Sequence, residues 1–417
     1  MWLKRGMMLI LKNARVLDVN HRDDDGRYSV VIEQGIIREV RQGDYAGGTH
    51  AHTIDVGGRT VMPGMVDCHV HVVASVANLG SNAQLPNVFA TLRAVPILEA
   101  MLRRGFTTVR DAGGADYALA RAISDGLIKG PRLFISGKAL SQTGGHGDFR
   151  DRFNDRDPDP CACNRNAGAI ARVVDGVDNV RRAVREEMRA GANQIKIMAS
   201  GGVASPTDPI ANLQYSVDEV RAIVEEAASH QTYVMGHAYT PQAIKRVVEL
   251  GVRTIEHGNL IDDDAAQSMA RCGAYAVPTL VTYDALHKVG AQYGIGPGSV
   301  AKIDDVRLQG MNSLDVFRRN GVKMGIGSDL LGEMHRFQSD ELLLRAQVLD
   351  PFEVICQATA IGAEIVKMPG KLGVVAEGAH ADLLVVDGDP LADLSVLTGQ
   401  GERIDYVIKD GEIVFGE

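Results

Sequence analysis

The chain has 417 residues, of which 45% are hydrophobic and 23% charged, and its formal net charge is −9. This composition is ordinary for a globular protein with a large core. The basic residues are scattered along the chain, which argues against a nucleic-acid partner. No apolar run approaches the roughly 20 residues that a membrane span needs.

The N-terminal run and the cysteines indicate an intracellular protein. MWLKRGMMLILKNARVLDV lacks both an apolar h-region and a small-residue cleavage site, so a secretory signal is not expected. The cysteines form neither an even set nor paired CxxC motifs. Free thiols in a reducing cytoplasm fit this pattern best. The five are Cys68, Cys161, Cys163, Cys272 and Cys356.

Both ends of the chain contain short strand-like runs separated by glycine-containing turns. At the start these are LILKNARVLDV, SVVIEQGIIREV and HTIDVGGRTV. The C-terminal part contains ADLLVVDGD and IDYVIKDGEIVF, the latter with an Asp410-Gly411 hairpin turn. Neither end is long enough to bury a core alone. We therefore expect residues 1–62 and 372–417 to pair into one small β-sandwich domain.

Between these ends, a helix-like stretch repeatedly ends at a glycine and a β-branched run follows at once. The glycines sit where a helix needs a C′ residue with positive φ, at Gly105, Gly191, Gly251, Gly273 and Gly321. The runs predict strands near 62–71, 106–111, 132–136, 194–200, 232–238, 253–257, 275–280 and 323–329. Eight strands alternating with helices predict an α/β fold, a (β/α)₈ TIM barrel over residues 63–371. A doubly wound open sheet would alternate in the same way, but the polar residues described below favour the barrel.

One long irregular segment, residues 144–168, follows the third predicted strand. A loop of this length in a compact domain is usually functional or disordered, and we interpret it as a lid. It contains Cys161 and Cys163. These two could form a soft metal site, but two thiols in a loop are the simpler interpretation.

Polar residues that are costly to bury recur at the C-terminal ends of the predicted strands. Singly, each has a structural explanation: a hydrogen-bonded strand-end histidine, half of a buried ion pair, or a helix cap. Jointly, six such residues from five strands converge on the rim where barrel enzymes build their active sites. They are His69, His71, Lys196, His237, His257 and Asp329.

These residue types suit two divalent metal ions, with zinc as the default for imidazole-rich sites. The two histidines of the first strand point the same way and can bind one ion, while His237 and His257 supply nitrogens for a second. A buried lysine with a lowered pKa can react with CO₂. N-carboxylation of Lys196 would give a carbamate with one oxygen for each metal. Asp329 would bind a metal and accept a proton from the bridging water.

These residues resemble the amidohydrolase superfamily, in the subtype whose binuclear centre is bridged by a carboxylated lysine. The resemblance covers nearly the whole chain, through VMPGMVDCHVH, GFTTVRDAGG, QIKIMASGG, MGHAYT, TIEHGN, GIGSDLLG and GAHADLLVVDGDP. SQTGGHGD, IKIMASGGVASPTDP and HAYTPQAI are most similar to bacterial Xaa-Pro dipeptidases, carboxypeptidase-type dipeptidases and ochratoxin A-hydrolysing amidases. Mononuclear relatives such as imidazolonepropionases and deaminases lack the strand-4 lysine, so Lys196 argues against deamination.

The resemblance implies a hydrolase that releases a C-terminal amino acid from Xaa-Pro dipeptides or N-acyl amino acids by attack of a metal-bridging hydroxide. An ochratoxin A amidohydrolase releasing phenylalanine is an alternative with the same chemistry. A cyclic amide or ester hydrolase and a metal-free scaffold protein are alternatives of other classes. The resemblance also implies that His146 and Tyr239 bind a small-molecule substrate, although packing at a strand end explains the presence of Tyr239 nearly as well. We expect a homo-oligomer with no nucleic-acid or membrane partner.

Overall fold

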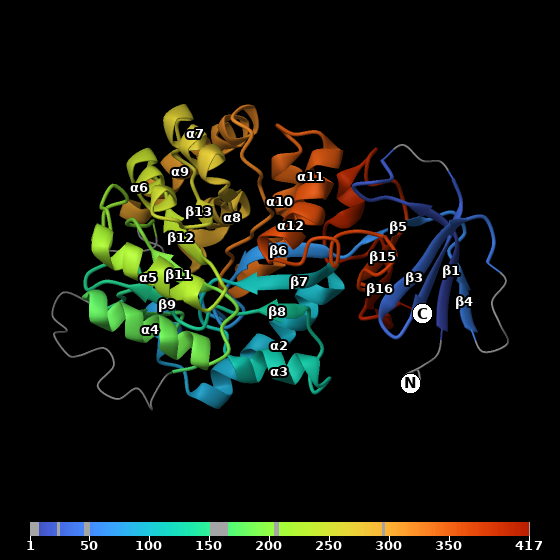
Figure 1. Cartoon of the computed structure of the whole chain (residues 1–417), viewed down its shortest axis with the longest axis horizontal. Coiled ribbons are helices and arrows are strands. Elements are labelled where there is room, and N and C mark those ends of the chain that lie inside the picture. Colours follow the sequence, from blue (N-terminus) through green and yellow to red (C-terminus); the bar gives the residue numbers. More distant parts are fainter. Residues whose placement is uncertain are drawn as a thin grey trace.

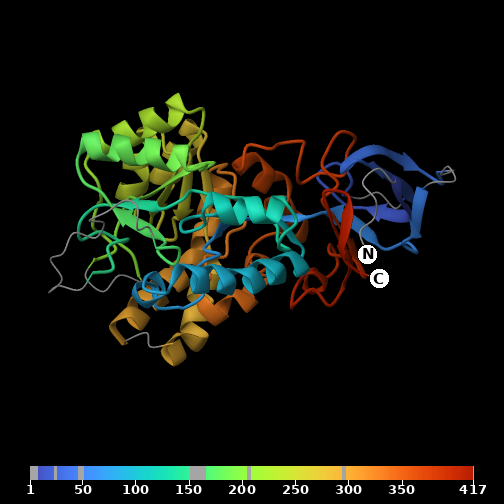
Figure 2. The ribbon, with the colours of Figure 1, turned by 90° about the horizontal axis from the view of Figure 1, so that it is seen from below.

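The computed structural model describes residues 8–22, 26–45, 51–150, 166–203, 208–293 and 297–416. A β-sheet forms one end of the molecule, and helices surround a second group of strands at the other end (Figure 1). Segments from the two ends of the chain lie side by side in the sheet (Figure 2). Within the described residues, no helix is both long and apolar enough to cross a membrane.

The sheet at one end combines strands from the beginning and the end of the chain. They are β1 (Met8–Val16), β2 (Tyr28–Glu33), β3 (Ile36–Gln42), β4 (Ala51–Asp55), β5 (Thr60–Pro63), β15 (Leu383–Val386), β16 (Ile404–Lys409) and β17 (Glu412–Phe415). Their order is β17-β16-β15-β5-β1-β2-β3, and β4 pairs with β1. The predicted hairpin turn joins β16 to β17, and Asp410 and Gly411 both have positive φ, 49° and 76°.

Strand β15 attaches this sheet to the rest of the molecule because both of its faces are buried. Leu383 and Val385 pack into a core built from the two ends of the chain. Leu384 and Val386 pack into the main core on the other face. Successive strand residues point to opposite faces, so one short apolar strand serves two cores. Full burial of each side chain contributes about 1.5–3 kcal/mol.

The remaining strands run parallel, in two groups. The first group is β6 (Met65–Val70), β7 (Phe106–Asp111) and β8 (Arg132–Phe134). The second is β10 (Ala171–Val173), β9 (Ala139–Ser141), β11 (Ile195–Met198), β12 (Val234–Ala238), β13 (Thr254–His257) and β14 (Tyr275–Val277). Seven predicted strands are confirmed, most with shorter bounds. The short strands β9 and β10 were not predicted. They pair with each other and flank the predicted lid, of which residues 151–165, including both cysteines, lie outside the described residues.

The predicted strand over 323–329 is wrong as a regular strand. In the described structure it makes an isolated parallel bridge between Ala276 and Met324, although its backbone still bonds to both β14 and β6. Glycine weakens a strand because it has no side chain to pack, and this segment contains Gly325 and Gly327. A Cβ on Gly325 would lie 2.5 Å from the Ile365 side chain, so that side chain lies close to the backbone here.

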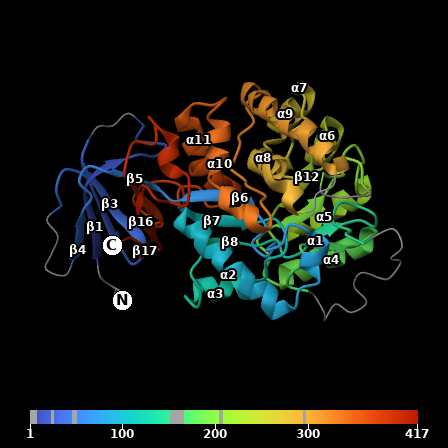
Figure 3. The same ribbon diagram turned by 180° about the vertical axis from the view of Figure 1, so that it is seen from behind.

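Helices occupy the connections between the parallel strands, and Figure 3 shows α6, α7 and α9 at the end opposite the sheet. The α-helices are α1 (Leu79–Ala83), α2 (Asn87–Arg103), α3 (Tyr117–Ser124), α4 (Val177–Arg189), α5 (Val217–Ser229), α6 (Pro241–Glu249), α7 (Asp263–Cys272), α8 (Leu280–Val289), α9 (Pro297–Arg319), α10 (Asp340–Arg345), α11 (Pro351–Ala358) and α12 (Ala360–Ile365). The 3₁₀ helices are η1 (Gly290–Tyr293), η2 (Gly332–Phe337) and η3 (Leu394–Leu397). The five glycines predicted to follow helices have φ between 66° and 100°, as expected.

An ion-pair cluster also ties the sheet to the helical part. Arg132, at the start of β8, lies 3.2 Å from the carboxylate of Asp382 and also contacts Asp410. Asp382 is buried, and its other carboxylate oxygen accepts the backbone N–H of Asp410 at 2.7 Å. The arginine therefore neutralises a carboxylate that is out of contact with water.

Replacing Arg132 with methionine should lower the free energy of unfolding by about 3 kcal/mol, because Asp382 loses the cation that it contacts. Arg121→Met is the matched control, since it removes an exposed ion pair with Asp125 and should lower the free energy of unfolding far less. Urea unfolding followed by circular dichroism measures both variants. Equal losses would show that the Arg132 cluster does not join the two parts.

Candidate metal centre

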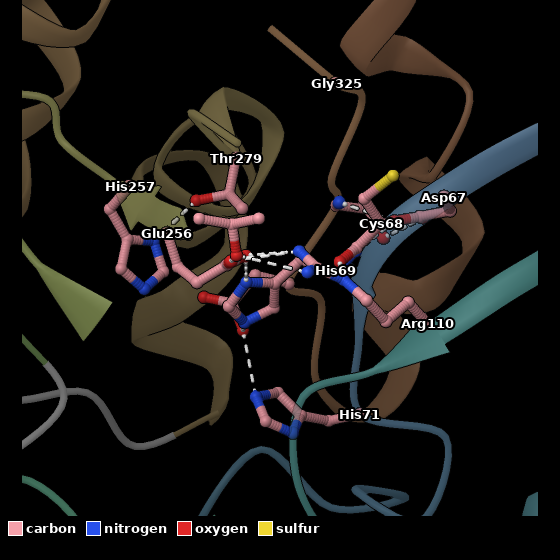
Figure 4. A network of polar contacts seen from close by, with 12 residues as sticks. Asp67, Cys68, His69, His71, Arg110, Glu256, His257, Thr279 and Gly325 are labelled. Carbon is pink, nitrogen blue, oxygen red and sulfur yellow. Dashed lines mark hydrogen bonds and ion pairs between the residues drawn. The ribbon is translucent and has the colours of Figure 1, made fainter. Parts of the chain in front are cut away.

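Three side chains with metal-binding atoms meet at the C-terminal end of β6. The Nε2 atoms of His69 and His71 lie 3.4 and 3.3 Å from Oδ1 of Asp329. Figure 4 shows the two histidines. One ligand atom from each residue lies within 4.8 Å of the others. Both histidines are buried. Two imidazole nitrogens and a carboxylate oxygen at this spacing can surround one divalent cation.

Three more predicted ligands lie on the neighbouring strands of the second group. His237, on β12, and His257, at the end of β13, have ring centroids 4.6 Å apart, and His257 lies 5.2 Å from His69 in the same measure. Lys196 lies on β11, the strand that pairs with β12. All of these side chains are buried. The rings of His69, His237 and His257 therefore lie close together in the structure.

Each of the four histidines already uses one ring nitrogen in a contact with a protein oxygen. His69 Nδ1 lies 2.7 Å from Glu256 Oε2, His71 Nδ1 lies 2.8 Å from the Gly113 carbonyl, His257 Nδ1 lies 2.7 Å from Thr279 Oγ1, and His237 Nε2 lies 3.1 Å from the Gly201 carbonyl. A neutral imidazole has one N–H and one lone pair. With the N–H donated to these oxygens, the other nitrogen of each ring carries the lone pair that a metal requires.

The pKa shifts of His237 and His257 favour the same assignment, whereas for His71 the effect of burial is outweighed by the Asp329 carboxylate, which raises the pKa. Burial lowers the pKa of His237 and of His257 well below 6.5, so both rings remain neutral at neutral pH. Burial also lowers the pKa of Lys196 to about 8, which makes an unprotonated amine accessible near neutral pH. Burial alone would raise the pKa of Asp329, but the adjacent histidines hold it well below its usual range. Asp329 is therefore ionised, as an anionic metal ligand would have to be.

The backbone is strained at two of these residues and at one of their partners. His257, Asp329 and Thr279 have φ values of 73°, 50° and 39°, in the left-handed region that disfavours side chains with a Cβ. Each such residue costs about 1–3 kcal/mol, and such residues cluster at functional sites. The surrounding hydrogen bonds must therefore stabilise an unfavourable local conformation to keep the ligands in place.

Sequence analysis did not identify a buried ion pair beside these ligands. Arg110 Nη2 donates to both carboxylate oxygens of Glu256, at 2.9 and 3.1 Å, while Glu256 accepts from His69. Arg110 Nε also donates to the carbonyl of Cys68, the residue before His69, at 2.6 Å. The pair thus holds His69 through both its side chain and its backbone (Figure 4). The only sequence signal was the position of Glu256 next to His257.

His146, predicted to bind substrate, packs directly on the histidine cluster. Its ring stacks on that of His237, with centroids 4.2 Å apart. Its backbone N–H donates to the Gln214 side chain at 3.1 Å. Gly202 leaves the space that this arrangement needs, since a Cβ there would lie 2.1 Å from the His146 ring.

Tyr239, the other predicted substrate residue, is also buried against the cluster. Its ring stacks on His257, with centroids 5.1 Å apart, and its hydroxyl lies 2.7 Å from the hydroxyl of Tyr283. Tyr283, which sequence analysis did not single out, lies 3.0 Å from Nδ1 of His257. The hydroxyls of Tyr239 and Tyr283 therefore form a chain of contacts that ends at Nδ1 of His257, the nitrogen that also contacts Thr279.

Glu256→Gln should weaken Zn²⁺ binding by about 10- to 100-fold, because an uncharged amide holds the N–H of His69 less firmly. Glu341→Gln is a matched control: Glu341 is equally buried, and its hydrogen bonds go to Arg345 and the backbone of Val281. This control should bind Zn²⁺ like the unmodified chain. Competition with a chromophoric chelator measures both affinities, and equal weakening would contradict a specific role for Glu256.

Comparisons with known proteins show to which family this chain belongs. The model of the amidohydrolase family matches residues 60–414. The ochratoxinase of Aspergillus niger is 30% identical over 368 residues, which are 85% of this chain and 76% of that protein. A prolidase solved in complex with N-methylphosphonate-L-proline is 57% identical, with a TM-score of 0.96 over 98% of this chain and 100% of that one. A Xaa-Pro dipeptidase with methionine bound in its active site is 29% identical, with a TM-score of 0.86 over 98% of this chain and 100% of that one. This chain therefore belongs to the amidohydrolase family.

Proposed function

We propose that this chain is a binuclear metal-dependent dipeptidase that releases the C-terminal amino acid from Xaa-Pro dipeptides or from N-acyl amino acids. The donor set carries the proposal: four imidazoles, each with one nitrogen occupied by the protein, occur together with the buried amine of Lys196 and the carboxylate of Asp329. The relative solved with N-methylphosphonate-L-proline is a prolidase at 57% identity, which favours proline as the leaving amino acid.

We infer that the two parallel sheets form a (β/α)₈ barrel over residues 63–371, and that 1–62 and 372–417 form the small domain. Backbone contacts support closure. Asn193 donates to the Ile135 carbonyl at 2.7 Å between the β8 and β11 sides, and the segment after α9 bonds to β14 and β6. A closed barrel would bring the C-terminal ends of all strands to one rim, so that ligands far apart in sequence can meet.

The side chains divide into two groups of metal ligands. His69 and His71 would hold one ion, His237 and His257 would hold the second, and Asp329 would bind one of them. The amine of Lys196 would attack CO₂ and lose a proton, giving a carbamate that would supply two further oxygen donors for the ions. When bound, the two ions, zinc by default, would polarise the scissile carbonyl and lower the pKa of water.

The residues of the chain would supply the proton transfers and the substrate contacts. Asp329 would accept a proton from the attacking water and donate it to the leaving nitrogen as the C–N bond breaks. His146 and Tyr239 would donate hydrogen bonds to the carbonyl oxygen or to the terminal carboxylate. Burial raises the pKa of Tyr239, so its phenol remains protonated and able to donate.

Hydrolysis of ochratoxin A, with release of phenylalanine, is a second candidate function. The 30% identity to the Aspergillus niger ochratoxinase favours it. Both substrate classes contain an amide whose leaving amino acid carries a free carboxylate. The same donors could therefore recognise either class, and the walls of the pocket would select between them.

Lys196→Ala should abolish dipeptide hydrolysis, because no other side chain supplies the bridging anion in this proposal, and small carboxylic acids should partly restore it. The unmodified chain should carry about two divalent ions and lose activity with chelators. Mass spectrometry of the metal content and an assay with Xaa-Pro dipeptides check both. Unchanged turnover in Lys196→Arg, or in metal-free protein, would rule out the carbamate-bridged centre.

Xaa-Pro dipeptides with a free carboxylate should have a kcat/KM roughly 10- to 100-fold above their C-terminal amides, since a hydrogen bond to a charged group contributes about 1.5–3 kcal/mol. His146→Ala or Tyr239→Phe should remove much of this preference. Tyr275→Phe should retain it, because that hydroxyl bonds to Glu364 at 2.9 Å instead. Equal rates for acids and amides would favour the cyclic amide or ester hydrolase, and faster cleavage of ochratoxin A would favour the second candidate.

A further inference from the structure

One buried carboxylate joins the two backbone segments that carry His69 and Asp329. Asp67 Oδ1 accepts the backbone N–H of His69 at 3.0 Å and that of Ser328 at 3.1 Å. Its Oδ2 accepts the Ser328 hydroxyl at 2.6 Å and the side-chain amide of Gln338 at 2.8 Å. The backbone N–H of Asp329 in turn donates to the His69 carbonyl at 2.8 Å. Asp67 therefore stabilises the turn that holds Asp329 in its left-handed conformation.

The other end of the Gln338 side chain meets Arg104, which follows α2. Oε1 of Gln338 accepts from Arg104 Nε at 3.1 Å and from Nη2 at 2.9 Å. A guanidinium can only donate hydrogen bonds, so the amide oxygen of Gln338 must face Arg104. Its NH₂ group is then the part that meets Asp67. The chemistry of the two neighbours sets the orientation of this amide.

The hydrogen bonds to Gln338 also stabilise the positive charge of Arg104, which is buried. Arg104 is 2% exposed, and within the described residues the hydrogen bonds of its guanidinium go to side-chain amide oxygens. The third hydrogen bond runs from Nη1 to the side-chain oxygen of Gln400, at 3.0 Å. A buried cation surrounded by neutral amides is costly. The negative charge that acts on it is that of Asp67, on the far side of the Gln338 amide.

We propose that Asp67, Gln338 and Arg104 form a positioning relay for the candidate metal centre. Arg104 holds the amide of Gln338, and Gln338 holds Asp67. Asp67 then places the backbone of His69 and the turn before Asp329. The proposal rests on the proposed metal-dependent function, and it assigns to these three residues the geometry of the ligands, not a contact with substrate.

Gln338→Glu tests the relay because it separates the two contacts of this side chain. The introduced carboxylate pairs better with Arg104 but presents an oxygen to Asp67, where an N–H is required. Gln400→Glu is the matched control, since it places the same charge against the same guanidinium without touching Asp67. Gln338→Glu should weaken Co²⁺ binding by about 10- to 100-fold and change the visible absorption of the bound ion. Gln400→Glu should leave both unchanged.

A second substitution provides a rescue. In the double variant Asp67→Asn, Gln338→Glu, the introduced amide at position 67 donates an N–H to the introduced carboxylate at position 338. The hydrogen bond is thus restored with donor and acceptor exchanged, and a large part of the Co²⁺ affinity should be recovered. Gln338→Met, which removes both contacts without adding charge, should also weaken Co²⁺ binding and serves if Gln338→Glu does not fold. Thermal unfolding monitors the fold of every variant.

The outcomes separate this proposal from the proposed function. Hydrogen exchange of peptides covering 65–71 and 326–332, measured without metal, should be faster in Gln338→Glu than in Gln400→Glu. The relay is overturned if Gln338→Glu keeps the affinity, the spectrum and the exchange rates of the unmodified chain. If the unmodified chain binds Co²⁺ but cleaves no amide, the proposed function fails while the relay is still tested by affinity and exchange.

Discussion

An imidazole can offer a metal only one nitrogen, and a buried imidazole must satisfy the other within the protein. This constraint explains the surroundings of the candidate centre. A carboxylate, a hydroxyl and two backbone carbonyls contact the four histidines, and each leaves the opposite nitrogen for an ion. His237 differs from the other three because its Nε2, not its Nδ1, is occupied. The backbone around the site is arranged to supply these acceptors.

The charges near the centre follow from the same constraint. Glu256 is needed as the acceptor for His69, yet an isolated buried carboxylate would be costly. Arg110 compensates it, and the pair is completely buried. Burial is the largest influence on the pKa of Lys196 and lowers it, Glu256 acts to raise it, and Arg110 has a smaller effect that lowers it. Burial, and not the ion pair, therefore favours the neutral amine that a carbamate requires.

The strained backbone at Asp329 lies next to the hydrogen bonds that stabilise it. Asp329 adopts a left-handed backbone conformation just beyond a glycine-containing segment that fails to form a regular strand. Asp67 and the His69 carbonyl stabilise the turn by accepting hydrogen bonds from Ser328 and from the backbone N–H of Asp329. The sheet built from both chain ends packs against the same core through alternate residues of β15. Rigid packing around a strained turn suits a site in which ligand positions must be reproducible.

Local patterns in the sequence were sufficient for most of the fold. Periodicity and post-helical glycines located seven of the parallel strands, because burial on both faces requires continuous apolar runs. The Asp410-Gly411 turn followed from the backbone conformation that a two-residue hairpin requires. Patterns of period two or 3.6 cannot identify β9 and β10, because each strand is only three residues long. Nor can such patterns show how closely side chains approach the backbone at Gly325.

The candidate ligands could be named from the sequence because histidine, lysine and aspartate are conspicuous at the ends of apolar strands. The residues that contact and position these candidate ligands could not be named from the sequence. Arg110, Glu256, Gln338 and Tyr283 resemble ordinary polar residues in the sequence, and their contacts join positions separated by 26 to 271 residues. Which nitrogen of each histidine faces a metal, and which amide end faces Asp67, depends on neighbours that only tertiary packing brings together. Hydrogen bonds are directional and short, so the folded structure alone decides them.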